Sequence, residues 1–179
     1  MQIIDVVIPA HNEEDSIGLV IDDIPRQLVR EIVVISNNSS DNTEKVARQK
    51  GATVLNEPRK GYGHACLKGI FYLGTKKPVP DVVVFMDADY ADHPDELEKL
   101  VKPIITGSCD LVIGSRALGN REPGSMMPQQ IFGNTLAVNM IRWLYGKKFT
   151  DLGPFRAIRY DGLMQMDMVE KKWGWTVEM

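Results

Sequence analysis

Residues 82–89 of this chain read VVVFMDAD and indicate both its fold and its chemistry. Five apolar residues in a row, Val82 to Met86, are typical of a strand that is buried on both faces, as in a parallel sheet. Two carboxylates, Asp87 and Asp89, follow directly. Charged groups at the mouth of a buried strand cost desolvation free energy unless a partner compensates them. The stretch therefore predicts a parallel sheet with a polar site at the end of this strand.

Further short apolar runs occur along the chain, and amphipathic stretches separate them. Strands are expected over residues 3–8, 31–35, 52–55, 82–86 and 110–114, with Pro9 closing the first, and helices over 16–24, 43–50, 63–73 and 97–105. Strands separated by helices need crossover connections. The order therefore predicts an α/β fold with a largely parallel sheet covered on both faces.

The second half of the chain breaks this rhythm. A long loop is expected over 117–130, a mostly apolar helix over 131–145, and a short strand or turn over 151–158. The length fits a single domain, residues 1–179. Its last residues, WGWTVEM, read as the middle of a structural element, so we expect a chain truncated at the C-terminus.

Composition excludes several classes of function. A hydrophobic content of 44% and a charged content of 25% are those of a soluble globular domain, and the net charge of −3 argues against a nucleic-acid partner. No stretch approaches the roughly 20 apolar residues of a transmembrane helix, and no signal peptide is evident. Cys66 and Cys109 have no metal-ligand spacing and are expected to be buried free thiols. We expect a cytoplasmic protein, with peripheral contact at the cytoplasmic face of a membrane left open.

Candidate site residues follow the expected strands, because ligands of open parallel sheets bind beyond the carboxyl ends of the strands. These stretches are His11 to Glu14, Ser36 to Asp41, Asp87 to Asp92, and Ser115-Arg116. Each has a purely structural alternative. The first could simply start a helix, Asp41 has the spacing of a capping box with Glu44, and Asp92 is expected to cap the helix introduced by Pro94.

Asp89 lies too early to cap that helix, so a hard divalent cation is the favoured partner of Asp87 and Asp89. Mg²⁺ or Mn²⁺ takes carboxylate oxygens and keeps room for phosphate oxygens. Residues 59–65, RKGYGHA, place cations and two glycines before a helix. Cys66 stands where a dinucleotide fingerprint needs its third glycine, so this match is weak, but an anion-facing helix N-terminus is expected here.

Four segments in this order resemble family 2 glycosyltransferases, which have the GT-A fold, a Rossmann-like three-layer α/β/α arrangement. They are IPAHNEE at 8–14, SNNSSDNT at 36–43, RKGYGHA at 59–65 and DAD at 87–89. GSR at 114–116 and DLGPFRA at 151–157 are similar to the branch containing dolichyl- and polyprenyl-phosphate sugar transferases. The resemblance implies inverting displacement of a sugar from a nucleotide-diphosphate donor onto an acceptor, such as a polyprenyl phosphate.

The resemblance also implies roles for individual residues. The nucleoside pocket would be lined by Pro9, Ala10, Asn12 and Glu13. Asp87 would lie near the ribose or the metal, Asp89 would ligate the metal, and Arg116 and Arg156 would face phosphates. Asn37, Lys60 and Gly61 join the nucleotide-binding candidates by their places after a strand and before a helix.

Donor and acceptor are only partly constrained. Asn37 stands where the family has a second Asp, and an amide suits the single N–H of uracil better than the N–H edge of guanine, which favours a UDP-sugar. A lipid phosphate, with a second pKa of about 6, would need no strong base. A hydroxyl acceptor would need one, and Asp151 or Glu178 is the candidate, although each could instead be a cap or an ion-pair partner.

Two other functions remain open. A sugar-phosphate nucleotidyltransferase should carry a glycine-rich, arginine-containing loop after the first strand, where PAHNEE stands. A non-catalytic nucleotide-sugar-binding domain would keep the pocket without turnover.

Overall fold

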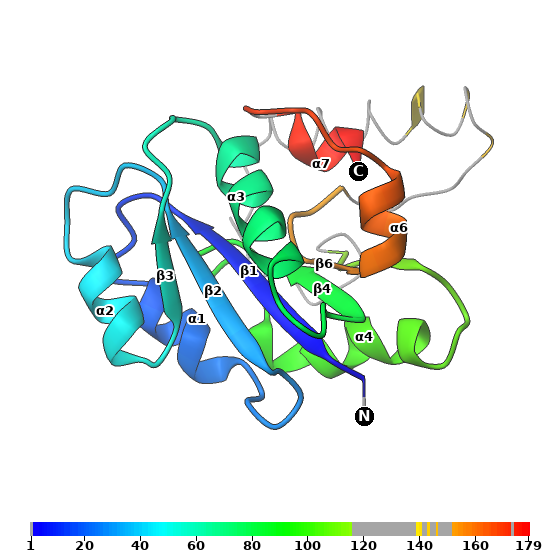
Figure 1. Cartoon of the computed structure of the whole chain (residues 1–179), viewed down its shortest axis with the longest axis horizontal. Coiled ribbons are helices and arrows are strands. Elements are labelled where there is room, and N and C mark those ends of the chain that lie inside the picture. The colour runs from blue at the N-terminus through cyan, green and yellow to red at the C-terminus, as the bar shows by residue number, and fades with distance from the viewer. Residues whose placement is uncertain (1, 116–138, 141–142, 144–145, 147–151, 173) are drawn as a thin grey trace.

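The computed structural model describes residues 2–115, 139–140, 143, 146, 152–172 and 174–179 (Figure 1). Its strands are β1 (Ile4–Ala10), β2 (Glu31–Ser36), β3 (Thr53–Asn56), β4 (Val82–Phe85), β5 (Leu111–Ile113) and β6 (Arg156–Arg159). Its helices are α1 (Ile17–Asp23), α2 (Thr43–Gln49), α3 (Tyr62–Gly74), α4 (Leu97–Ile105), α6 (Tyr160–Gln165) and α7 (Trp175–Glu178), and a 3-10 turn, η1, spans Pro94–Glu96.

The strands form one sheet in the order β3-β2-β1-β4-β6-β5. β1 pairs in parallel with β2 and β4, and β2 pairs in parallel with β3. β6 runs antiparallel to both of its neighbours, β4 and β5. The predicted α/β fold with a mostly parallel sheet is therefore confirmed.

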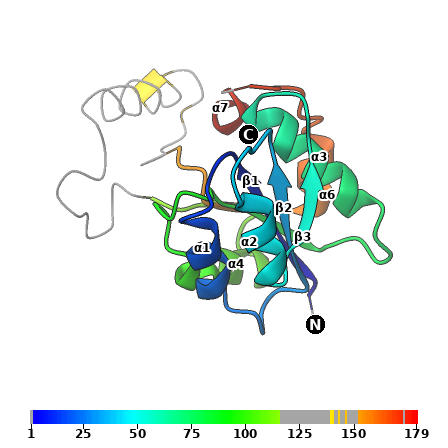
Figure 2. The same ribbon diagram turned by 90° about the vertical axis from the view of Figure 1, so that its left-hand side faces the viewer.

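Helices cover both faces of this sheet, as Figure 2 shows. Val6 and Ile8 of β1 pack with residues of α1, α2 and α4, whereas Val7 packs with residues of α3, α6 and α7. This alternation follows from the two-residue period of a strand. Every residue of β1 and β4 is buried, which confirms the strand predicted from VVVF as covered on both faces.

β1 differs from its predicted end, because it continues through Pro9 to Ala10. On the β2 side, Ala10 C=O accepts the N–H of Asn37 at 2.8 Å. The backbone N–H and C=O groups of successive strand residues point alternately to the two neighbouring strands. The N–H that Pro9 lacks would therefore point toward β4. The pairing with β4 already ends at Val7 and Phe85. Proline is tolerated there because no ladder hydrogen bond needs its N–H.

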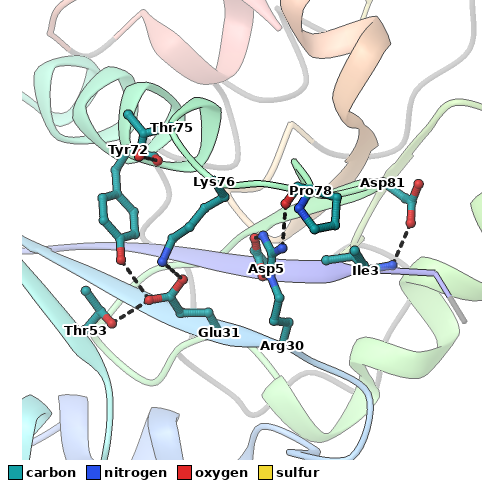
Figure 3. A network of polar contacts seen from close by, with 10 residues as sticks. All are labelled: Ile3, Asp5, Arg30, Glu31, Thr53, Tyr72, Thr75, Lys76, Pro78 and Asp81. Carbon is teal, nitrogen blue, oxygen red and sulfur yellow. Dashed lines mark hydrogen bonds and ion pairs between the residues drawn. The ribbon is translucent and has the colours of Figure 1, made fainter.

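A polar network lies at the amino ends of the strands (Figure 3). Asp5 is fully buried, and Arg30 donates to both of its carboxylate oxygens and, at 2.7 Å, to the carbonyl of Pro78. Burial dominates over this ion pair and raises the pKa of Asp5. Beside it, Glu31 accepts hydrogen bonds from Thr53 and Tyr72 and pairs with Lys76. These contacts join β1, β2, β3 and α3 at the end opposite to the predicted site.

Several predictions concern residues outside the described part of the chain. They are the loop over 117–130, Arg116 and Asp151, together with most of the helix over 131–145, of which residues 139, 140 and 143 are described and helical. Among the described residues, no helix is long and apolar enough to cross a membrane. Cys66 is buried as expected, but Cys109 is only half-buried because it precedes the edge strand β5.

Candidate active site

A cavity of about 400 Å³ opens where β1, β2 and β4 end and α3 begins. It is lined by Pro9, Ala10, His11, Glu13, Asn37, Lys60, Gly61, Tyr62, Ala65, Asp87, Ala88 and Asp89. A mostly apolar concavity with a few convergent polar groups is typical of a small-molecule site. The cavity thus brings together residues from the segments 8–14, 36–43, 59–65 and 87–89, whereas Ser115 is not among its lining residues.

Asp87 follows β4, is half-buried, and is held by a tyrosine that the sequence analysis did not single out. The Tyr62 hydroxyl donates to Asp87 Oδ1 at 2.9 Å. Burial, together with the nearby Cys66 and Asp87, raises the pKa of Tyr62 well above its ordinary value, so the phenol remains a donor at neutral pH. The available signal was the position of Tyr62 between the two glycines of RKGYGHA.

Asp89 is exposed at the rim of the cavity, and its Oδ1 accepts the N–H of Ala91 at 3.0 Å. The prediction that Asp92 caps the next helix is wrong. η1 begins after His93 without a side-chain cap, and Asp92 instead lies 3.4 Å from the N–H of Asp87 as its acceptor. The turn after β4 therefore folds back on itself.

Asp87 and Asp89 provide hard oxygen ligands of the kind that Mg²⁺ and Mn²⁺ prefer. Among the described residues, no group of three or more His, Cys, Asp or Glu side chains could hold a metal ion. A site with two carboxylates leaves most coordination positions for phosphate oxygens and water, which is how Mg²⁺ is commonly bound with nucleotides. The residues present therefore fit a divalent ion that arrives with a diphosphate.

Asn37 lies at the end of β2 and holds the loop of residues 57–61 against the cavity. Its Nδ2 donates to the carbonyls of Glu57, at 2.9 Å, and Arg59, at 2.7 Å, and its Oδ1 accepts the N–H of Gly61 at 2.9 Å. Both amide hydrogens are thus used within the protein. Among the described residues, Oδ1 accepts this one hydrogen bond, and an amide oxygen has a second lone pair for a further donor.

The loop held by Asn37 also contains a buried carboxylate. Glu57 is 1% exposed and accepts hydrogen bonds from the backbone N–H and guanidinium of Arg59. These bonds lower the pKa of Glu57 to about 2. The ion pair fixes the loop just before Lys60 and Gly61, which line the cavity.

Asn12 lies outside the residues that line the cavity. It has a φ of 56°, its Oδ1 accepts the N–H of Ser40 at 2.8 Å, and its own N–H donates to Ser39. These contacts join the turn after β1 to the turn after β2. The predicted capping box of Asp41 with Glu44 is wrong, because Asn42 is the N-cap of α2 and makes no side-chain cap hydrogen bond, while Asp41 accepts the N–H of Thr43 at 3.0 Å.

Glu13 and His11 lie on the β1 side of the cavity. The Glu13 carboxylate accepts the Ser16 hydroxyl at 2.6 Å. His11 Nδ1 lies 2.7 Å from the carbonyl oxygen of Asn37 and therefore carries the hydrogen. His11 was a candidate only as part of the stretch from His11 to Glu14, because nothing local indicates that its ring turns toward β2.

The N-terminus of α3 was expected to face an anion, but in the structure other residues of the chain accept two of its N–H groups. The N–H groups of Gly63 and His64 donate to the carbonyls of Lys172, at 3.0 Å, and Lys171, at 3.1 Å. The chain itself therefore takes donors that a phosphate would need. The orphan N–H groups of a helix can be satisfied in this way as well as by a ligand.

Two further candidates lie outside the cavity lining. Arg156 is fully buried, and its guanidinium donates to the carbonyls of Leu152, Gly153 and Thr176. The carboxylate of Glu178 accepts the backbone N–H groups of residues 169 and 170. The structure thus places both side chains in contacts to the backbone.

The chain matches the family model Glycosyl transferase family 2 over residues 5–166. It is 34% identical to an uncharacterised protein of Methanocaldococcus jannaschii, over 80% of this chain and 58% of that protein. It is 29% identical to the UDP-N-acetylglucosamine–dolichyl-phosphate N-acetylglucosaminyltransferase of Methanococcus voltae, over 81% of this chain and 64% of that enzyme. Glucosyl-3-phosphoglycerate synthase from Mycobacterium tuberculosis, solved with Mn²⁺, UDP-glucose and phosphoglyceric acid, superposes with a TM-score of 0.75 at 26% identity, over 98% of this chain and 62% of that one.

The chain thus spans 58% to 64% of the length of these three relatives. The match to the family model covers all four segments that meet at the cavity. The chain belongs to glycosyl transferase family 2 and has the GT-A fold.

Proposed function

We propose that this chain forms the donor-binding and catalytic part of a glycosyltransferase that moves a hexosyl group from a UDP-sugar to an acceptor, with a polyprenyl phosphate favoured. The observation that carries the proposal is the cavity, in which two carboxylates from the end of β4 face the ends of β1 and β2 and the start of α3. The relatives add support, because one is named for UDP-N-acetylglucosamine and dolichyl phosphate, and another was solved with UDP-glucose and Mn²⁺.

The diphosphate would lie over Asp87 and Asp89. These residues would hold a Mg²⁺ or Mn²⁺ ion, which when bound supplies Lewis-acid stabilisation of the negative charge that develops on the leaving phosphate. Tyr62 orients Asp87 through its 2.9 Å hydrogen bond. Lys60, exposed at the rim, would add a charge-assisted hydrogen bond to the diphosphate.

The base would lie between the β1 turn and Asn37. The remaining lone pair of Asn37 Oδ1 can accept one N–H, which matches the N3–H of uracil. Guanine would present two neighbouring N–H donors, for which this single lone pair is not enough. The Asn37 amide hydrogens already bind the carbonyls of Glu57 and Arg59, so the amide cannot turn to suit another base without losing these bonds. Pro9 and Ala10 would form the wall beside the nucleoside.

The acceptor is proposed from chemistry. A phosphomonoester with a second pKa of about 6 is largely ionised at neutral pH and can attack the anomeric carbon without a strong base. Of the two arginines predicted to face phosphates, Arg156 is committed to backbone carbonyls, so we assign the acceptor phosphate to Arg116. A lipid acceptor would place the protein at the cytoplasmic face of a membrane, and attack from the face opposite the diphosphate would invert the anomeric centre.

The test is turnover with defined substrates. The protein is incubated with UDP-glucose, UDP-N-acetylglucosamine or UDP-galactose, MnCl₂, and either a polyprenyl phosphate or no acceptor. UDP release and the anomeric configuration of the product are then measured. We expect acceptor-dependent UDP release that is lost in Asp89→Asn and retained in Asp110→Asn, an exposed control. Formation of UTP from UDP-sugar and pyrophosphate would instead identify a nucleotidyltransferase, and binding without turnover a non-catalytic domain.

A further inference from the structure

Residues 170–172 lie against the N-terminal end of α3. We call residues 169–172 and 174–179, which include α7, the strap. Figure 1 shows α7, within the strap, beside that end of the helix. The approach is so close that only glycine fits beneath it. A Cβ at Gly61 would lie 2.2 Å from the carbonyl oxygen of Lys171, and one at Gly63 would lie 2.1 Å from that of Glu170. The two glycines of RKGYGHA therefore admit the strap, which is a different role from that of a phosphate loop.

The strap is fixed at two places in α7. Trp175 is 1% exposed and its ring packs edge-on against Phe85 of β4, with centroids 5.9 Å apart. Next to it, the carbonyl of Thr176 accepts a hydrogen bond from the buried Arg156 at 3.1 Å. α7 is thereby anchored in the layer between the sheet and solvent.

Glu178 connects this anchor to the part of the strap that touches α3. Its Oε2 accepts the N–H of Glu170 at 2.9 Å, and its Oε1 accepts the N–H of Val169 at 3.1 Å. The residues that follow, Lys171 and Lys172, offer their carbonyls to the first turn of α3. Loss of the Glu178 carboxylate would release the start of the strap while leaving Trp175 in the core.

The first turn of α3 is also one wall of the donor cavity, because Gly61 and Tyr62 line it and Tyr62 holds Asp87. We propose that Glu178 is a positioning residue, which locks the strap onto α3 and so keeps the Gly61–Tyr62 wall in its donor-binding shape. The inference rests on the proposed function. Glu178 would then position the strap and would not transfer a proton, since its carboxylate lies outside the cavity lining and accepts two backbone N–H groups.

The two roles predict opposite responses to substitution. If the strap is seated in only about a tenth of the molecules, the apparent Kd for UDP rises about tenfold, while kcat of the bound donor changes little. Oε2 of Glu178 accepts both N–H groups, that of Val169 at 3.3 Å and that of Glu170 at 2.9 Å. Glutamine keeps one such oxygen, so Glu178→Gln should retain donor binding. A general base behaves differently, because glutamine cannot take a proton and kcat would fall by about 10² to 10⁴.

The experiment measures UDP affinity by calorimetry with MnCl₂, and kcat and KM with the best donor, for the full chain. The variants are Glu178→Ala, Glu178→Gln, Gly63→Ala and the exposed control Glu98→Ala. We expect about a tenfold rise in Kd for Glu178→Ala and Gly63→Ala, and a Kd within about threefold of the native value for Glu178→Gln and Glu98→Ala. Gly63→Ala unseats the strap without touching Glu178, so it keeps the test valid if Glu178→Ala folds poorly.

Hydrogen exchange of the Val169 and Glu170 amides gives a readout that is independent of turnover. It should accelerate in Glu178→Ala and remain near native in Glu178→Gln. A large loss of kcat in Glu178→Gln with an unchanged Kd would overturn the inference in favour of a general base, and native affinity in both Glu178→Ala and Gly63→Ala would overturn it outright. If the native protein does not bind UDP at all, the proposed function fails instead, and the exchange data still report whether Glu178 locks the strap.

Discussion

Replacing Asn37 by aspartate keeps the shape of the side chain and removes both N–H groups that bind the loop of residues 57–61. The carbonyls of Glu57 and Arg59 lie 2.9 and 2.7 Å from Nδ2 and would then face a carboxylate oxygen. Each lost hydrogen bond costs about 1 kcal/mol, and an unmet acceptor beside a negative charge adds about as much again, so we expect Asn37→Asp to lower the free energy of unfolding by about 2–4 kcal/mol at pH 7.

The effect should depend on pH with a definite sign. Two carbonyl oxygens favour the protonated carboxyl, which can donate a hydrogen bond, so the pKa of the new group should rise on folding above about 3.9. The penalty is then fully present above the folded-state pKa. It diminishes as the pH falls through that value toward the unfolded-state pKa.

Urea unfolding followed by far-UV circular dichroism measures the penalty at pH 7 and at pH 4. Asn139→Asp, at an exposed position, introduces the same charge and should unfold like the native protein. The comparison between the two variants at each pH removes the general effect of acid. If Asn37→Asp were within about 0.5 kcal/mol of the native protein at pH 7, which is the range of ordinary surface substitutions, the assignment of Asn37 to the loop would be refuted.

Three further predictions concern other contacts. Tyr62→Phe removes the hydrogen bond to Asp87 and should weaken Mn²⁺-dependent UDP binding about 2- to 12-fold in calorimetry, the equivalent of about 0.5–1.5 kcal/mol; unchanged affinity would show that Asp87 needs no support. Arg30→Met leaves Asp5 buried without its cation and should lower the free energy of unfolding, measured in urea, by about 3 kcal/mol. The double variant with Asp5→Asn should regain most of this stability. The pKa of Glu57, lowered to about 2, means that its ion pair stabilises the fold above about pH 4.5 and is lost as the pH falls toward 2; Glu57→Gln should flatten this part of the stability curve, and an unchanged acid transition would contradict the assignment.

Hydrophobic periodicity was sufficient to predict the parallel strands, because each is a short apolar run and each is followed by a break in the pattern. It also placed Asp87 and Asp89 correctly at the end of β4, since residues after buried strands of a parallel sheet meet at one edge. Pro9 was misjudged as a strand end because a single sequence does not show which edge of β1 carries pairing at that residue.

The remaining site features depend on contacts between segments that are distant in the chain. Gly61 and Gly63 were interpreted as part of an anion-facing helix N-terminus, but the atoms that demand glycine belong to Glu170 and Lys171, more than a hundred residues later. The resemblance of residues 151–157 to a family segment implied that Arg156 faces a phosphate, and nothing local indicates that this arginine is fully buried and donates to backbone carbonyls. Such roles depend on which distant segments come into contact in the folded chain, and no local pattern in the sequence indicates these contacts.

The central claim is that Asp87 and Asp89 hold a divalent ion beneath the donor diphosphate. Anomalous diffraction from crystals grown with UDP and MnCl₂ tests it most directly, because the manganese signal locates the ion independently of the protein model. We predict one manganese peak bonded to a carboxylate oxygen of Asp89 and to the diphosphate, and no peak in Asp89→Asn. A diphosphate bound in the cavity by Lys60 or an arginine, with no manganese beside Asp87 or Asp89, would contradict the account.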